Sequence, residues 1–224
     1  LGEAQSHYLC NVMKAAQGDE ILCFNNRDGE FLCRIDKIDK KHTELALQQQ
    51  TKAFVPSPDV WLMFAPLKKD QTDFVIQKAT ELGARRIMPV ITQFCITDKV
   101  KKERFIAQAI EAAEQSRRVD IPAISEALSL PKVLQNWDNA RKLFFMDETG
   151  GGNEICEVFA AAKGQKAAIL VGPEGGFAPE ELALLRKMEA AKAVSLGPRI
   201  LRAETAVAAA LACWQAIAGD WSAK

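Results

Sequence analysis

The sequence predicts an α/β protein in which a parallel sheet is preceded by a small β-domain. Two observations support this. Residues 1–52 contain short apolar runs separated by polar turns, whereas from residue 60 onward strand-like apolar runs alternate with helical patterns. Strand and helix alternate five times, the pattern of a parallel sheet covered on both faces. We expect domains at residues 1–52 and 60–224, joined by a linker at residues 53–59 that contains Pro56 and Pro58.

The first domain is expected to be a small barrel of short strands. Residues 21–24 and 31–35 are apolar runs that flank the turn-forming residues 25–29, a hairpin signal, and residues 43–47 form a third candidate strand. Such a domain could dock a substrate or could serve only as a structural cap. The residues alone leave both roles open.

In the second domain the elements follow each other with recognisable helix boundaries. Thr72 or Asp73 is the expected N-cap of the first helix and Gly83 its C′ residue, Asn153 caps the third helix, and Pro179 suits the first position of the fourth. The expected strands are residues 60–65, 86–91, 143–146, 167–171 and 193–196, and the expected helices are residues 74–82, 103–117, 154–162, 179–188 and 204–218.

Composition limits the classes of function. The 224 residues include 29 basic and 29 acidic side chains, so any nucleic acid must be bound by local basic clusters, not by a general positive field. The six cysteines are scattered without metal-ligand spacing, which predicts buried reduced thiols and no metal. No apolar run has the length of a membrane span, so we expect no membrane partner. The first residue is leucine, and we expect the β-domain to be incomplete at its N-terminus.

Two glycine-proline loops are the strongest functional signal. Gly172-Pro173-Glu174-Gly175-Gly176 follows one apolar strand, and Gly197-Pro198 follows another. Ligands of open α/β sheets bind outside the carboxyl ends of the strands, where the backbone of such loops can approach them closely. On neighbouring strands the two loops would form one pocket.

The residues of the first loop leave a tight turn, a phosphate cradle and a cofactor loop open. Pro173 lacks an amide donor and Glu174 adds negative charge, and both features favour a ligand without phosphate. The only histidines, His7 and His42, lie in the first domain, which excludes histidine acid–base catalysis in the second. Arg202 and Glu204 could contact substrate, or equally could form an ion pair and cap the last helix.

The two loop sequences, GPEGG and LGPRILRAETA, resemble those of the RsmE family. These are SPOUT-class methyltransferases that modify N3 of a uridine in small-subunit (16S) ribosomal RNA. The resemblance extends almost end to end, through the further segments at residues 7–14, 18–21, 28–30, 77–83 and 113–116.

This resemblance implies a SPOUT-type sheet with a C-terminal trefoil knot, a PUA-like N-terminal barrel, a homodimer and a cytoplasmic enzyme. It also implies S-adenosylmethionine as the cofactor. The residues expected to bind it are Leu170, Gly172, Pro173, Glu174, Gly175, Gly176, Leu196, Gly197, Ile200, Leu201, Thr205 and Ala206.

The expected catalytic residues are Arg202, Arg118 and Glu204, the two arginines as cations that stabilise the uracil anion. The expected RNA-binding residues are His7, Lys14, Lys37, Lys40 and Lys41. The alternatives are a SPOUT enzyme that methylates a ribose 2′-hydroxyl and a non-catalytic RNA-binding factor for ribosome assembly.

The chain departs from the family pattern in three places. Residues 92–95 stand where an arginine is common, Arg117 replaces a glycine before Arg118, and Ala178 replaces a serine cap. These departures bear on RNA contacts more than on the cofactor loops.

Overall fold

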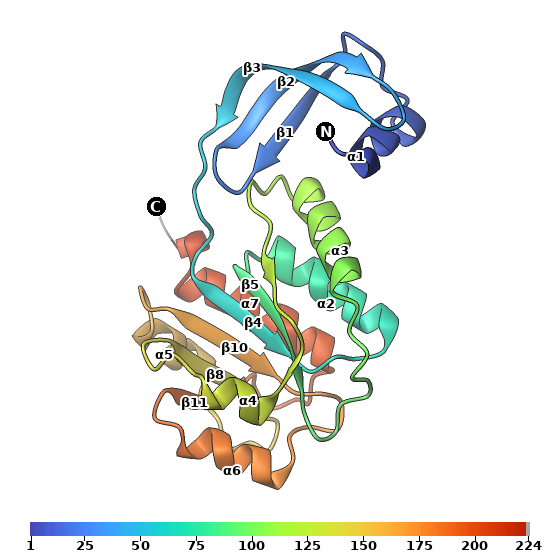
Figure 1. The fold of residues 1–224 in the computed structure, drawn as a ribbon. Coiled ribbons are helices and arrows are strands. Elements are labelled where there is room, and N and C mark those ends of the chain that lie inside the picture. Colours follow the sequence, from blue (N-terminus) through green and yellow to red (C-terminus); the bar gives the residue numbers. More distant parts are fainter. Residues whose placement is uncertain (223–224) are drawn as a thin grey trace. The chain divides into compact units, whose positions relative to one another are not determined.

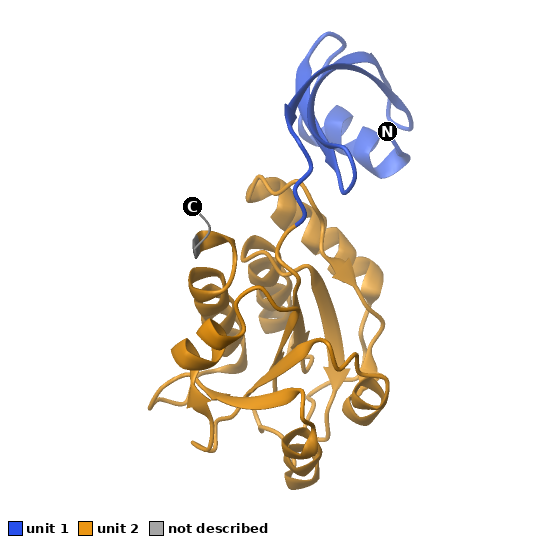
Figure 2. Cartoon of the chain, turned by 90° about the vertical axis from the view of Figure 1, so that its left-hand side faces the viewer, with its two compact units in different colours: residues 1–56 blue, residues 57–224 orange. Residues whose placement is uncertain are grey.

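The computed structural model describes residues 1–222 and divides the chain into two compact units, residues 1–56 and 57–224 (Figure 2). The division falls between Pro56 and Ser57, inside the segment where a linker is predicted. Each unit is described by itself below.

The first unit is a curled three-stranded antiparallel sheet preceded by a short helical segment (Figure 2). The strands are β1 (Glu20–Asn25), β2 (Gly29–Ile38) and β3 (Thr43–Lys52). The predicted hairpin is confirmed: Asn25 Oδ1 accepts the backbone N–H groups of Arg27 and Asp28 at 2.9 and 2.6 Å. Gly29 has φ +89°, and a side chain there would overlap the carbonyl of Lys52. The unit begins with α1 (Glu3–His7) and the π-helical turn η1 (Tyr8–Val12), which the sequence pattern did not predict.

The second unit is built on a parallel sheet, and this predicted fold class is confirmed (Figure 1). The strand order is β6-β5-β4-β10-β8-β11-β9, and β7 pairs with β5 beyond this path. The strands are β4 (Val60–Phe64), β5 (Arg86–Ile91), β6 (Ala123–Ile124), β7 (Leu128–Ser129), β8 (Lys142–Met146), β9 (Asn153–Glu154), β10 (Ala167–Val171) and β11 (Ala191–Ser195).

Five of the helices of the second unit were predicted, although not all their ends. The helices are α2 (Lys69–Glu81), α3 (Lys102–Gln115), α4 (Leu130–Gln135), α5 (Ile155–Ala161), α6 (Pro179–Lys187) and α7 (Ala203–Ile217), followed by the 3-10 turn η2 (Asp220–Ser222).

The predicted N-caps of α2 and α5 were wrong: Asn153 belongs to β9, and Glu154 is the N-cap of α5. Helix α2 starts at Lys69, five residues before its predicted start, so Thr72 lies inside the helix and is not its N-cap. Its hydroxyl instead accepts the N–H of Leu67 and donates to the carbonyl of the same residue, both at 3.0 Å. Helix α4 was not predicted, because its six residues are too few to show a helical period.

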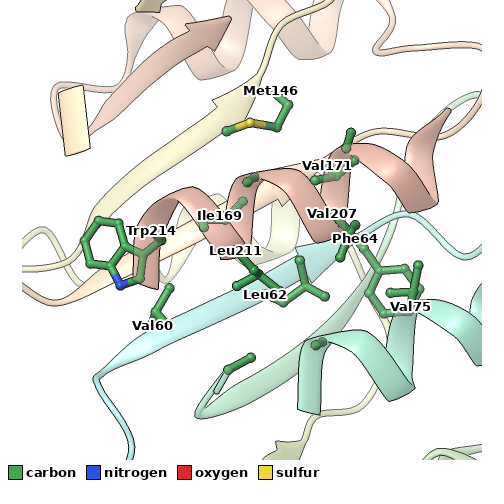
Figure 3. Close-up of a cluster of buried hydrophobic side chains, with 14 of the residues drawn as sticks. Val60, Leu62, Phe64, Val75, Met146, Ile169, Val171, Val207, Leu211 and Trp214 are labelled. Atoms are coloured by element: carbon green, nitrogen blue, oxygen red, sulfur yellow. The ribbon is translucent and has the colours of Figure 1, made fainter. Parts of the chain in front are cut away.

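The sheet is covered on both faces, and successive residues of its strands alternate between them. Leu62 and Phe64 of β4 belong to the core beneath α2, α3, α5 and α7, whereas Met63 belongs to the core beneath α4 and α6 (Figure 1). Figure 3 shows Leu211 and Trp214 of α7 in the first of these cores.

Helix α7 is mainly a core helix. Its buried alanines, Ala203, Ala206 and Ala210, let the helix lie close to its neighbours α2, α5 and β10. The trefoil knot implied by the resemblance stays a prediction, with which this strand order is consistent.

Within residues 1–222, no helix combines the length and the apolar character needed to cross a membrane. The six cysteines are free thiols, and the prediction that they are buried holds for Cys33 but is wrong for Cys156, which is exposed.

Candidate functional site: a pocket at the carboxyl ends of three adjacent strands

A pocket of about 860 Å³ lies at the carboxyl ends of β8, β10 and β11. These three strands are neighbours in the sheet, in the order β10-β8-β11. Three segments provide most of the wall: residues 146–150, 171–175 and 194–203. Lys68 and Gln71 at the start of α2 and Ala206 of α7 complete it. The size is that of a pocket for a small organic ligand.

The prediction that the two glycine-proline loops follow neighbouring strands was wrong. Strand β8 lies between β10 and β11, and the loop that follows it, residues 147–150, forms the middle of the pocket wall. Sequence reasoning missed this loop. Its signal was present, since an apolar strand runs directly into Asp147, Glu148 and three glycines at positions 150–152.

The first predicted loop is a turn that packs against an aromatic ring. The N–H of Gly176 donates to the carbonyl of Pro173 at 3.0 Å, and Gly176 has φ +71°, a conformation that favours glycine. A Cβ at Gly172 would lie 3.1 Å from the ring of Phe177. The backbone of this loop is therefore packed on one side and forms the pocket wall on the other.

The second predicted loop leaves open space beside its glycine. Gly197 has φ +99°, and a Cβ there would meet no atom within 4 Å. Its N–H donates to the hydroxyl of Ser195 at 3.3 Å. Further along the loop, Ile200 is 86% exposed although it lines the pocket. The loop thus offers backbone groups and an apolar side chain to a ligand.

Arginines without an ion pair lie where this loop enters α7. Arg202 is the N-cap residue, and its carbonyl accepts the N–H of Ala206 at 2.8 Å. Across residues 1–222 the side chains of Arg199 and Arg202 have no hydrogen bond or ion pair, so the alternative of an Arg202–Glu204 ion pair is not present. Both guanidinium groups are free to meet a ligand. Glu204 has one carboxylate oxygen that is buried without a hydrogen-bond partner.

The wall of the pocket also contains acidic residues, Asp147, Glu148 and Glu174. Burial would raise the pKa of Asp147, but hydrogen bonds from the hydroxyl and N–H of Thr149 and from Arg186 hold that pKa below its ordinary value. Burial, and then the charge of Asp147, raise the pKa of Glu148. Glu174 accepts a hydrogen bond from the side-chain amide of Gln71 at 2.9 Å. The pocket therefore contains carboxylates that can bind hydroxyl donors or a cation.

The structure brings most of the predicted cofactor residues together, although not all of them touch the pocket. Leu170 is buried within β10, Gly176 belongs to the first loop without lining the pocket, and Thr205 is an exposed residue of α7 that does not line it either. The predicted residues that line the pocket are Gly172, Pro173, Glu174, Gly175, Leu196, Gly197, Ile200, Leu201, Arg202 and Ala206.

Arg118 is not among the residues that line the pocket. Its side chain is 8% exposed and pairs with Asp120 at 2.7 Å. It also donates to the carbonyls of Thr80 and Ala84 at 2.7 and 2.9 Å. These contacts indicate a structural role: Arg118 connects the end of α2 and the segment before β5 to the segment after α3.

The predicted RNA-binding residues are all exposed in the first unit. His7 ends α1, where its Nδ1 lies 2.8 Å from Asn11 Nδ2, and Lys14 follows the π-helical turn with φ +54°. Lys37 lies on β2, 3.9 Å from Glu44, and Lys40 and Lys41 lie in the turn between β2 and β3.

Comparison with known proteins agrees with both units. Residues 55–215 match the family model of an RNA methyltransferase domain, and residues 1–48 match that of an RNA methyltransferase PUA domain. The fold and the pocket thus define a class of protein, the RNA methyltransferases that carry an N-terminal PUA domain.

Particular relatives narrow this class. Ribosomal RNA small subunit methyltransferase E of Rickettsia conorii is 36% identical, over 92% of this chain and 84% of the relative, and that of Bacillus subtilis is 31% identical, over 89% and 82%. A crystal structure of the enzyme from Neisseria gonorrhoeae, bound to S-adenosylmethionine, superposes with a TM-score of 0.89 at 27% identity over 99% of this chain and 92% of that one. The chain belongs to the ribosomal RNA small subunit methyltransferase E family, and the predicted family and SPOUT-type fold are confirmed.

Proposed function

We propose that the protein transfers a methyl group from S-adenosylmethionine to N3 of a uridine in small-subunit (16S) ribosomal RNA. The observation that carries the proposal is the pocket at the ends of β8, β10 and β11, whose wall combines carboxylates with unpaired arginines. The names of the relatives support the substrate, and the bound cofactor of the Neisseria gonorrhoeae structure supports the methyl donor.

The residues of the pocket fit S-adenosylmethionine. The open space beside Gly197 admits a flat group against the backbone of the second loop, and Leu196 and Leu201 supply apolar contacts for an adenine ring. Glu148 and Glu174 can accept hydrogen bonds from ribose hydroxyl or ammonium groups, and their negative charge favours a cation. When bound, the cofactor supplies an electrophilic methyl group on a positively charged sulfur.

The substrate side of the reaction needs a cation and an exposed base. N3 lies on the Watson–Crick edge of uracil, so the uridine must be unpaired when it enters the site. To take the methyl group, N3 must give up its proton, to solvent or to a carboxylate of the site. Arg202 can stabilise the negative charge that develops on the uracil oxygens, and alignment of the two reactants supplies much of the rate.

We infer further that the enzyme is a cytoplasmic homodimer. The exposed Ile200 at the wall of the pocket supports this inference, since it offers an apolar contact to a second copy beside the site. The cytoplasmic location is inferred from the proposed substrate, ribosomal RNA. Sedimentation at micromolar concentration tests whether the protein is a dimer, and a fully active monomer would contradict this inference.

Nucleoside analysis tests the reaction itself. Small-subunit RNA from cells that lack the gene is incubated with the protein and S-adenosylmethionine carrying a labelled methyl group, then digested and examined by mass spectrometry. Labelled 3-methyluridine supports the proposal. A 2′-O-methylated nucleoside would assign the alternative ribose chemistry, and cofactor or RNA binding without transfer would indicate a non-catalytic assembly factor.

A further inference from the structure

An exposed aromatic side chain lies beside the pocket in a place that the proposed reaction does not explain. Phe94 belongs to the loop that follows β5 and is 45% exposed. Its Cβ lies 3.3 Å from the point where a side chain of Gly175 would begin, and Gly175 lines the pocket. The phenyl group therefore borders the rim of the site, separated from the pocket by one glycine.

The exposure of Phe94 is not the result of a loosely held loop. The N–H of Cys95 donates to the carbonyl of Thr92 at 3.2 Å, which closes a turn around the phenylalanine. The thiol of Cys95 lies 3.5 Å from the carbonyl of Pro66 and 3.4 Å from that of Thr97. The turn is thus held at the position after Phe94 by both backbone and side chain.

A buried carboxylate ties this turn to the glycine-rich loop. Glu181 of α6 is 7% exposed, and its two oxygens accept the N–H of Gln93 at 2.9 Å and the N–H of Ala178 at 3.0 Å. Gln93 precedes Phe94, and Ala178 follows the glycine-rich loop. One side chain therefore connects the turn that contains Phe94 to the segment that follows the glycine-rich loop.

Positive charge follows Phe94 in the chain and is also present at the pocket. Lys99 and Lys101, in the segment that leads from the turn to α3, are exposed, and Lys68 lines the pocket itself. An exposed aromatic ring and lysines at one site are the combination that binds single-stranded nucleic acid, because bases stack on the ring and phosphates meet the cations.

We propose that Phe94 is a stacking platform for the nucleobase next to the target uridine. The proposal rests on the proposed function, since it needs an RNA whose target base enters the pocket. Phe94 lies outside the pocket wall, so its ring meets a flanking base and not the base that is methylated. Stacking there would position the unpaired target and would contribute mainly to RNA binding.

Substitution at this position tests the idea with the full-length protein. The KM for small-subunit RNA, kcat and the affinity for S-adenosylmethionine are measured for Phe94→Ala, Phe94→Leu and Phe94→Trp. Stacking predicts a KM for RNA raised roughly tenfold by alanine, since loss of one base–aromatic stack typically weakens binding to that order. Leucine should behave like alanine, tryptophan should restore binding, and cofactor affinity should not change.

Matched controls separate stacking from loss of an exposed phenyl group. Phe74 of α2 is 38% exposed and lies against Lys78 of its own helix, so Phe74→Ala should leave the KM for RNA at the wild-type value. The fluorescence of Phe94→Trp should be quenched when RNA is added, which reports on stacking even if the alanine variant is unstable.

Three outcomes would overturn the proposal. One is a wild-type KM for Phe94→Ala, and another is a leucine variant that binds RNA as well as tryptophan does. The third is a shift of Phe94→Ala from dimer to monomer in sedimentation with RNA affinity lost only through that shift, which would place the ring between two copies of the chain. If the wild-type protein itself neither binds nor methylates RNA, the proposed function fails, and this inference with it.

Discussion

Glu148 lies where a side chain of residue 176 would have to be: a Cβ on Gly176 would overlap Oε1 of Glu148. The two residues come from different loops, one after β8 and one after β10. Glycine at 176 thus serves two purposes, the positive φ of the turn and the room for a carboxylate of the pocket wall. The position of Glu148 in the loop after β8 therefore depends on glycine at position 176 in the loop after β10.

Gly176→Ala should therefore lower the affinity for S-adenosylmethionine, by roughly tenfold if Glu148 is displaced from a single charged contact. Titration calorimetry measures this. Gly164→Ala is the matched control, because Gly164 also has positive φ, +79°, but has open space around it. It should cost about 1 kcal/mol of stability from backbone strain and leave cofactor affinity unchanged. Equal affinities in the two variants would remove the role of the Glu148 contact.

Gly172→Val should abolish cofactor binding in a folded protein. Its side chain would press on the ring of Phe177, which lies edge-on to Phe145 with 6.5 Å between ring centroids, and the loop would have to move into the pocket. Adding Phe177→Leu to the milder Gly172→Ala should recover part of the affinity, since the smaller residue makes room behind the loop. If the double variant binds no better than Gly172→Ala, the ring is not the obstacle.

Arg118→Ala should act on stability. Removing the guanidinium takes the arginine donors away from the carbonyls of Thr80 and Ala84 and leaves the buried Asp120 with the hydroxyl of Ser57 but no ion pair. Loss of one partner of a buried ion pair typically costs about 3–5 kcal/mol. Urea unfolding measures it. The remaining folded enzyme should keep near wild-type kcat, whereas Arg202→Ala should lower kcat with little change in stability. A large loss of kcat with unchanged unfolding in Arg118→Ala would restore the predicted catalytic role.

Stability should fall in acid partly through Asp147. Burial raises and hydrogen bonds from Thr149 and Arg186 more strongly lower its pKa, so the folded-state value lies below that of the unfolded chain. The contribution is therefore fully present above the unfolded pKa of about 3.9 and is lost as the pH falls through the lower folded value. Asp147→Asn should make the urea midpoint less dependent on pH below about 4. An unchanged pH profile would mean that other carboxylates dominate.

RNA affinity should depend on the turn between β2 and β3. Reversing both charges with Lys40→Glu and Lys41→Glu should weaken RNA binding and reduce the slope of log affinity against log salt by roughly one to two units. Filter binding across a salt series measures this, with Lys132→Glu of α4 as the control on the other unit. Cofactor affinity should be unchanged, because the residues that line the pocket belong to the second unit. An unaltered salt slope would exclude this turn from the RNA contact.

The sequence by itself determined the two-unit organisation, the parallel sheet and most of its elements, and the two glycine-proline loops. These features follow from local properties of the sequence. Strands and helices show their own periods, and turn residues such as Gly176 and Gly197 have backbone conformations that exclude most side chains. Helix α4 and the start of α2 were not predicted, because short segments and first helical turns show little periodicity.

Only the tertiary structure decided which loops meet. Strand order is set by packing between segments far apart in the chain, and it placed β8 between β10 and β11, which brought Glu148 into the pocket. Packing likewise buried Arg118 among carbonyl groups and left Arg202 unpaired, although in sequence both are arginines near a helix end. The local pattern indicates which residues can take part in chemistry. Whether such a residue has a structural or a reactive role depends on its contacts with segments far away in the chain, and local patterns do not predict those contacts.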